Sequence, residues 1–189
     1  MEGFREQKSR KKKKKKNSKP EAKTQISGDA LLKSAIKHHA QGDIANAEKY
    51  YREAINIDYT HQDIYTNLGV ICAESGRPEE AIFLYKKAIE ISPNEPDAYS
   101  NLGNLYQSLG NFESAVALSS KSLELKPNNP EALITLGWIY KELGNFDQAL
   151  ASTLKSLELK PDNPTAHMNL GSIYKDLGNL DQALASTLK

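Results

Sequence analysis

The chain has 189 residues, a formal net charge of +1 and 26% charged residues. Nothing in it approaches the roughly 18 consecutive apolar residues of a membrane-spanning helix, and its one cysteine, Cys72, excludes an internal disulfide. The basic start of the chain has no apolar segment behind it and so does not resemble a secretory signal. These features together predict a cytoplasmic protein.

Residues 1–26 form a basic segment that we expect to be a disordered tail. Residues 1–23 hold 11 Lys and Arg against 3 Asp and Glu, whereas residues 24–189 hold 14 against 21. The segment has no hydrophobic periodicity, so it cannot bury enough apolar surface to offset the entropy of ordering. One interpretation is a solvated tail that keeps the protein in solution. The other is weak, non-specific contact with nucleic acid or an acidic membrane, made by Lys11, Lys12, Lys13, Lys14, Lys15 and Lys16.

Residues 27–189 repeat with a constant period of 34 residues. The nine residues DQALASTLK occur twice, at 147–155 and 181–189, one period apart. Leu-Gly pairs, tyrosines, glycines, alanines and prolines recur in phase, as in Leu68-Gly69, Leu102-Gly103, Leu136-Gly137 and Leu170-Gly171. We call the residues at one position of successive repeats a column. A fixed period of this length indicates helical units that bury their apolar faces by stacking on one another.

Each repeat predicts two helices joined by a tight turn. The repeats are 28–61, 62–95, 96–129, 130–163 and a truncated 164–189. In the fourth repeat we expect Asn129 to cap the first helix and Gly144 to end it with a positive φ. We expect Asn145 to cap the second helix, and Asn179 to do the same in the fifth repeat.

A 34-residue period with Leu-Gly, Tyr, Gly, Ala and Pro in this order resembles the tetratricopeptide repeat (TPR) family. The resemblance covers residues 28–189. It implies an all-α fold, a TPR solenoid in which antiparallel helix pairs form a right-handed superhelix. It implies a protein–protein interaction scaffold that binds a protein or peptide segment in its concave groove, with no enzyme activity and no cofactor.

The last repeat stops inside its second helix, and no polar helix follows to close the array. We expect a fragment of a longer protein; the alternative is an open end that mediates self-association. Arrays of this composition are similar to the substrate-presenting N-terminal regions of some glycosyltransferases and sulfotransferases. On that alternative the catalytic domain would lie beyond residue 189. A third function, as an RNA or ribosome accessory protein, would rest on the lysine run alone.

No catalytic or metal-binding constellation is predicted. His38 and His167 fall in columns that hold aromatic residues in other repeats, so we expect both to be packed. His38 and His39 are adjacent, and they therefore point to different faces of a helix, unlike a metal-binding pair at i and i+4. Cys72 lies in the tyrosine column, and we expect a small buried hydrophobic side chain there.

In the TPR family the first helix of each repeat lines the concave surface. The groove residues that this implies are Asn67, Asn101, Asn104, Ile134, Trp138, Lys141, Met168, Asn169 and Ser172. The asparagines resemble the ladder in the TPR region of O-linked N-acetylglucosamine transferases, where one amide both donates and accepts. Thr135 interrupts this ladder, and asparagine is also common at this position in the TPR consensus.

Trp138 is the sharpest candidate in the groove. Its column otherwise holds Val, Asn and Ser, and it lies one helical turn after Ile134 and near Met168. An aromatic anchor with apolar neighbours and an amide rim is typical of a binding hot spot. The alternative is that the indole packs against the adjacent helix. The Lys and Arg of chaperone-binding TPR domains are replaced by Ser100, Asn104 and Asp97, which disfavours binding of an EEVD-type acidic tail.

Overall fold

A computed structural model describes residues 27–188, all of which lie in α-helices or the turns between them. The helices are α1 (Gly28–Ala40), α2 (Ile44–Asn56), α3 (Gln62–Glu74), α4 (Pro78–Ile91), α5 (Pro96–Ser108), α6 (Phe112–Leu125), α7 (Pro130–Glu142), α8 (Phe146–Leu159), α9 (Pro164–Asp176) and α10 (Leu180–Thr187). The proposed basic tail, residues 1–26 with its lysine run, lies outside the described part of the chain, as does Lys189. None of the helices described is long and apolar enough to cross a membrane.

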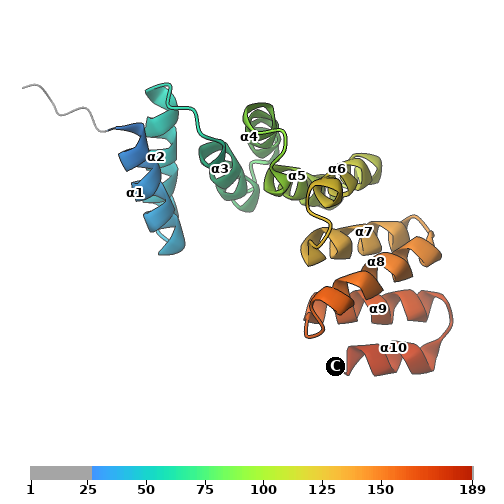
Figure 1. Ribbon diagram of the computed structural model, residues 1–189. Helices are drawn as coiled ribbons and strands as arrows, with labels where there is room; N and C mark the ends of the chain where they lie inside the picture. The colour runs from blue at the N-terminus through green and yellow to red at the C-terminus, as the bar shows by residue number, and fades with distance from the viewer. Residues whose placement is uncertain (1–26, 189) are drawn as a thin grey trace, which may run out of the picture.

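The helices form consecutive antiparallel pairs that stack in chain order from α1 and α2 to α9 and α10 (Figure 1). The first helices of successive repeats also contact one another, α3 with α5, α5 with α7 and α7 with α9. The first helices therefore lie closer together than the second helices, which places them on the inner side of the curved array. The predicted all-α solenoid is confirmed.

From α3 and α4 onward, each pair is held by a close approach of its two helices at the glycine of the Leu-Gly column, whereas the first pair has the buried Ala35 at this position. A Cβ added at Gly137 of α7 would overlap the hydroxyl of Thr153 on α8 and lie 3.3 Å from the Ala149 carbonyl oxygen. The leucine beside each glycine fills the seam; Leu136, for example, is buried. The turn that follows α7 uses Gly144 at φ 75°, as predicted, because a residue with a side chain rarely adopts this conformation.

The predicted capping residues are correctly placed, but only some of them cap. The Asn129 side chain accepts a hydrogen bond from the Ala132 backbone N–H at 3.2 Å. Asn145 and Asn179 occupy the N-cap positions of α8 and α10, yet their side chains accept no such bond, so this part of the prediction is wrong. The Asn145 backbone N–H donates to the Tyr140 carbonyl at 2.8 Å, as the Asn111 N–H donates to the Tyr106 carbonyl before α6, where the Asn111 side chain does cap the helix.

Four charged side chains connect the first two repeats. Arg77 Nη1 and Nη2 bind the two carboxylate oxygens of Glu48 at 2.8 and 2.9 Å, and Arg52 Nη2 lies 2.6 Å from Glu80 Oε1. The hydrogen bond from Arg77 lowers the pKa of Glu48, and the hydrogen bond from Arg52 lowers the pKa of Glu80. The network therefore joins α2 to α4 most strongly when both carboxyls are ionised.

We predict that this network makes the first interface sensitive to acid. A lowered pKa in the folded state means that the contribution is present above the unfolded-state pKa and is lost as pH falls through the folded-state value. Glu48→Gln should lower the free energy of unfolding by about 1 kcal/mol at pH 7. It should also flatten the loss of stability below about pH 5, where carboxyls begin to protonate.

Thermal unfolding followed by circular dichroism from pH 7 to pH 3 would measure both effects. Glu53→Gln is the matched control, because Glu53 lies on the same helix and only approaches Lys49 Nζ at 3.9 Å. Parallel loss of melting temperature in the wild type and Glu48→Gln would contradict the prediction.

Candidate functional site

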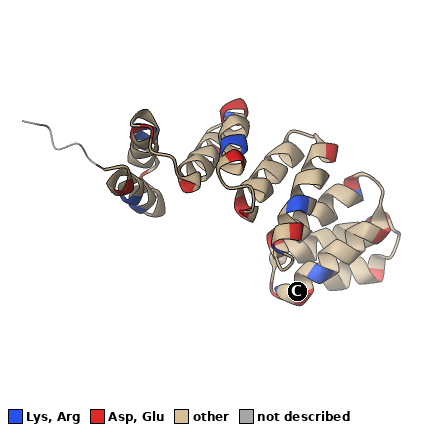
Figure 2. Ribbon diagram, turned by 45° about the horizontal axis from the view of Figure 1, so that its top comes forward, with Lys and Arg blue, Asp and Glu red and all other residues tan. Residues whose placement is uncertain are grey.

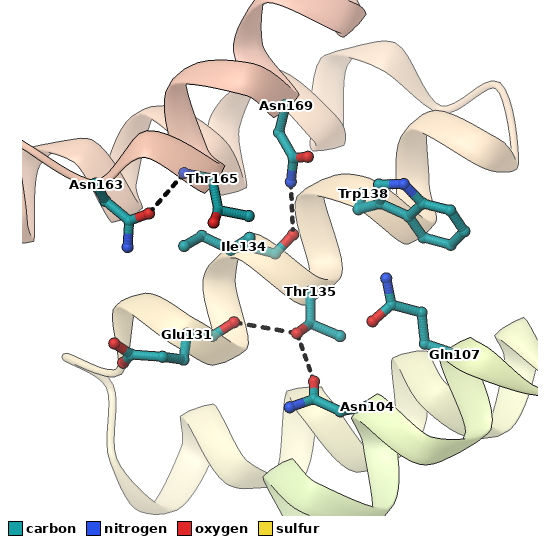
Figure 3. A pocket seen from close by; sticks show the side chains of 9 residues that line it. All are labelled: Asn104, Gln107, Glu131, Ile134, Thr135, Trp138, Asn163, Thr165 and Asn169. Atoms are coloured by element: carbon teal, nitrogen blue, oxygen red, sulfur yellow. Dashed lines mark hydrogen bonds between the residues drawn. The ribbon is translucent and has the colours of Figure 1, made fainter. Parts of the chain in front are cut away.

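A groove lies on the inner side of the array, where α5, α7 and α9 adjoin. Its volume is about 330 Å³. It is lined by Asn104, Gln107, Glu131, Ile134, Thr135, Trp138, Asn163, Thr165 and Asn169. The lining residues come from three successive first helices and the N-cap of α9, and Figure 3 shows the Glu131 carboxylate and the Trp138 indole on opposite sides of Ile134. We call this region the Trp138 groove.

The middle helix, α7, supplies four of the lining residues. Glu131, Ile134, Thr135 and Trp138 are spaced by three, one and three positions, so they lie along one face of the helix. The two ends of this stripe differ in chemistry, because Glu131 is a carboxylate and Trp138 is a large apolar ring. One helix therefore presents an acidic end and an aromatic end to the same groove.

The Trp138 indole is fixed by a second aromatic ring. Phe112, the first residue of α6, meets it edge to face with ring centroids 5.6 Å apart and an interplanar angle of 68°. Trp138 is partly buried by its surroundings, and Figure 3 shows the Gln107 side chain extending toward it. The indole therefore packs against a neighbouring helix, as the second interpretation of the sequence expected, and it also lines the groove.

The polar side chains of the groove are partly bonded to one another. The Thr135 hydroxyl donates to Asn104 Oδ1 at 2.6 Å, and Asn169 Nδ2 donates to the Ile134 carbonyl at 3.3 Å (Figure 3). Within residues 27–188, Asn104 Nδ2 and Asn169 Oδ1 make no hydrogen bond. The groove therefore retains one amide donor on α5 and one amide acceptor on α9. Thr135, which interrupts the row of asparagines in the sequence, is hydrogen-bonded to Asn104.

The structure gathers four of the nine predicted groove residues in the Trp138 groove, namely Asn104, Ile134, Trp138 and Asn169. Asn101 lies beside Asn104 in an adjoining groove of about 330 Å³ between α3 and α5. Neither groove is lined by Asn67, Lys141, Met168 or Ser172. Met168 is nevertheless 67% exposed on α9.

Lys141 is engaged in ion pairs. Its Nζ lies 2.8 Å from Glu142 Oε1 and 3.5 Å from Asp176 Oδ2, and its side chain is only 16% exposed. The hydrogen bond to Glu142 raises the pKa of Lys141. The charge of Lys141 therefore pairs with Asp176 and helps to hold α7 against α9.

Sequence reasoning missed Gln107, Glu131, Asn163 and Thr165 as groove residues. Helical spacing could have found two of them, because Gln107 follows Asn104 by three positions and Glu131 precedes Thr135 by four. Asn163 is buried, and its side chain caps α9 by accepting from the Thr165 and Ala166 backbone N–H groups. No signal in the sequence distinguishes this cap from one that also lines a groove.

His38 and Cys72 are packed against neighbouring side chains of the array. Over residues 27–188 no group of three or more His, Cys, Asp and Glu is arranged to hold a metal ion. His38 stacks on Tyr50, and its Nδ1 lies 2.9 Å from Asp43 Oδ2. Cys72 is buried, and burial raises the pKa of its thiol to about 11, so the thiol is protonated at neutral pH.

Models of the tetratricopeptide repeat match most of this helical array. The matches cover residues 32–61, 94–162 and 153–185, and a TPR repeat model matches residues 71–110. No curated protein matches the sequence.

Solved structures with the same architecture include several TPR proteins. A crystal structure of MamA has a TM-score of 0.71 and 23% identity, with 82% of this chain and 90% of MamA covered. TTC0263, a thermophilic TPR protein of Thermus thermophilus, has a TM-score of 0.69 and 22% identity over 85% of this chain and 88% of that one. YrrB, a TPR protein with an unusual peptide-binding site, has a TM-score of 0.71 and 21% identity over 86% and 84%. At these identities the similarity shows the fold.

We predict that Phe112 holds the Trp138 indole in place. Phe112→Ala should leave the helical content unchanged and cost about 1 kcal/mol of stability for the aromatic pair, in addition to the apolar burial that is lost. The chain has one tryptophan, so fluorescence reports on this ring alone. Emission should shift to longer wavelength and acrylamide should quench it more strongly, because the freed indole gains contact with water.

Phe146→Ala is the matched control for this measurement. Phe146 occupies the same position one repeat later, where Ser172 stands in place of the tryptophan. Equal fluorescence changes in the two variants would show that Phe112 does not position the indole.

Proposed function

Because the chain belongs to the tetratricopeptide repeat family, we propose that it is a protein–protein interaction scaffold that holds an extended partner segment in the Trp138 groove. The observation that carries this proposal is the convergence of an aromatic ring, an apolar side chain and unused amide atoms from three successive helices. Trp138 and Ile134 supply the apolar contact.

The amide atoms match the needs of an extended peptide. Each residue of a peptide main chain carries one N–H donor and one C=O acceptor, and both lose their water on binding. Asn104 Nδ2 can donate to a carbonyl, and Asn169 Oδ1 can accept from an N–H. A segment that crosses from α5 to α9 over α7 meets both atoms.

The aromatic pair makes Trp138 a suitable anchor. Binding costs less when the contacting side chain is already held in its bound orientation, and the edge-to-face contact with Phe112 restricts the indole in the free protein. Tryptophan is also among the residues that contribute most when a contact is desolvated. The free protein thus already holds the indole in one orientation, which lowers the cost of binding.

We expect Trp138→Ala to weaken binding of peptides that were selected on the full chain by roughly tenfold or more, as truncation of an aromatic hot spot does. The probe is a random dodecapeptide library displayed on phage and selected on the full chain. Affinities of individual synthetic peptides would then be measured by fluorescence anisotropy, with circular dichroism to verify that the variants fold.

Phe83→Ala is the control for loss of an exposed aromatic ring. Phe83 lies on α4, is 58% exposed and does not line the Trp138 groove. Selected peptides that bind Trp138→Ala as tightly as the wild type would refute the assignment of the groove.

A further inference from the structure

We propose that the segment bound in the Trp138 groove carries a lysine or arginine whose charged group pairs with Glu131, beside an apolar residue that contacts Trp138. This inference rests on the proposed function and adds the chemical class of the partner. It depends on the charge of the groove, the freedom of the Glu131 carboxylate and the spacing of the two residues on α7.

Glu131 is the one charged residue among the nine that line the Trp138 groove. The adjoining groove between α3 and α5 also has a single charged lining residue, Glu74. The nearby cation Lys141 is already paired with Glu142 and Asp176. A partner that follows the inner face therefore meets, at Glu131, a carboxylate whose ion pair with Lys160 is long, at 3.9 Å.

The repeat array, apart from the basic tail, carries an excess charge of the same sign. Residues 24–189 carry 21 Asp and Glu against 14 Lys and Arg. Figure 2 shows acidic residues on helices along the whole array, with fewer basic residues between them. A field of this sign draws a cationic segment toward the array and repels an anionic one.

The Glu131 carboxylate is available to a partner. Its side chain is 61% exposed, and its ion pair with Lys160 is long, at 3.9 Å from Oε1 to Nζ, with Lys160 itself 56% exposed. Exposed pairs of this kind contribute little, because water solvates both charges. A bound lysine or arginine can replace Lys160 at little energetic cost.

The spacing on α7 suits two neighbouring residues of an extended segment. Glu131 and Trp138 are seven positions apart, which is about 10 Å along a helix, with Ile134 and Thr135 between them. Successive side chains of an extended chain point to opposite sides. A segment crossing α7 near Ile134 thus directs one side chain toward the carboxylate and the next toward the indole.

Glu131 also has a helical role that a test must separate from recognition. It lies in the first turn of α7, as Asp29, Asp63 and Asp97 do in α1, α3 and α5, and negative charge there stabilises a helix. A loss of stability in a Glu131 variant is therefore expected for any function. A change in the peptides that the protein prefers is expected only if Glu131 takes part in recognition.

The test uses the same phage-displayed dodecapeptide library on the full chain, selected in parallel on the wild type, Glu131→Lys and Glu158→Lys. Glu158 lies on α8 and does not line the groove, so its variant matches the change in net charge. Wild type and Glu158→Lys should enrich peptides with lysine or arginine, whereas Glu131→Lys should lose this excess and enrich aspartate or glutamate. For one selected peptide, replacing the basic residue by glutamine should weaken binding to the wild type about two- to fivefold, as loss of a partly exposed ion pair does, and leave binding to Glu131→Gln almost unchanged.

Glu131→Gln also serves if Glu131→Lys does not fold, because it removes the charge without reversing it and should lose the preference for basic peptides. An excess of basic peptides that persists in both Glu131 variants would overturn the inference, as would a wild-type selection without such an excess. Either outcome leaves the proposed function intact if Trp138→Ala still weakens peptide binding. Selected peptides that ignore Trp138, or a library that yields no binder, would overturn the proposed function and this inference together.

Discussion

The close approach of two helices at a residue without a side chain is the constraint on which the array depends. A Cβ at Gly69, Gly103, Gly137 or Gly171 would lie too near the facing side chain, which is Tyr85, Ser119, Thr153 or Thr187 in turn. The same approach recurs every 34 residues with no insertion in the four pairs from α3 and α4 onward, whereas the first pair has Ala35 at this position. This register brings Asn104, Thr135 and Asn169 into one polar row across three helices.

The period and its columns were sufficient to predict the helix pairs and the positive φ at Gly144, because these features depend on residues close in sequence. The contacts that shape the groove join residues of different columns. The recurrence of residue types within one column therefore does not predict them. Trp138 meets Phe112, which lies 26 positions earlier, and Lys141 reaches Asp176, 35 positions later. Asn145 occupies a cap position without capping, whereas Asn111 at the same position one repeat earlier does cap, so the residue type at this position does not decide the bond.

The Trp138 groove combines three properties. An aromatic ring is held by a second ring, two amide groups keep one donor and one acceptor toward the groove, and a loosely paired carboxylate stands at the other end of α7. Each property alone has a structural explanation in packing, in helix–helix bonding or in the helix dipole. Their convergence on one side of three adjoining helices favours recognition of a segment that is extended, partly apolar and basic.

The most direct measurement is a crystal structure of the chain bound to a peptide selected from the library. Our account predicts peptide density crossing α5, α7 and α9, with an apolar side chain on the Trp138 indole and main-chain hydrogen bonds to Asn104 and Asn169. Density on the outer face, over α4, α6 or α8, with the Trp138 groove left open, would contradict it.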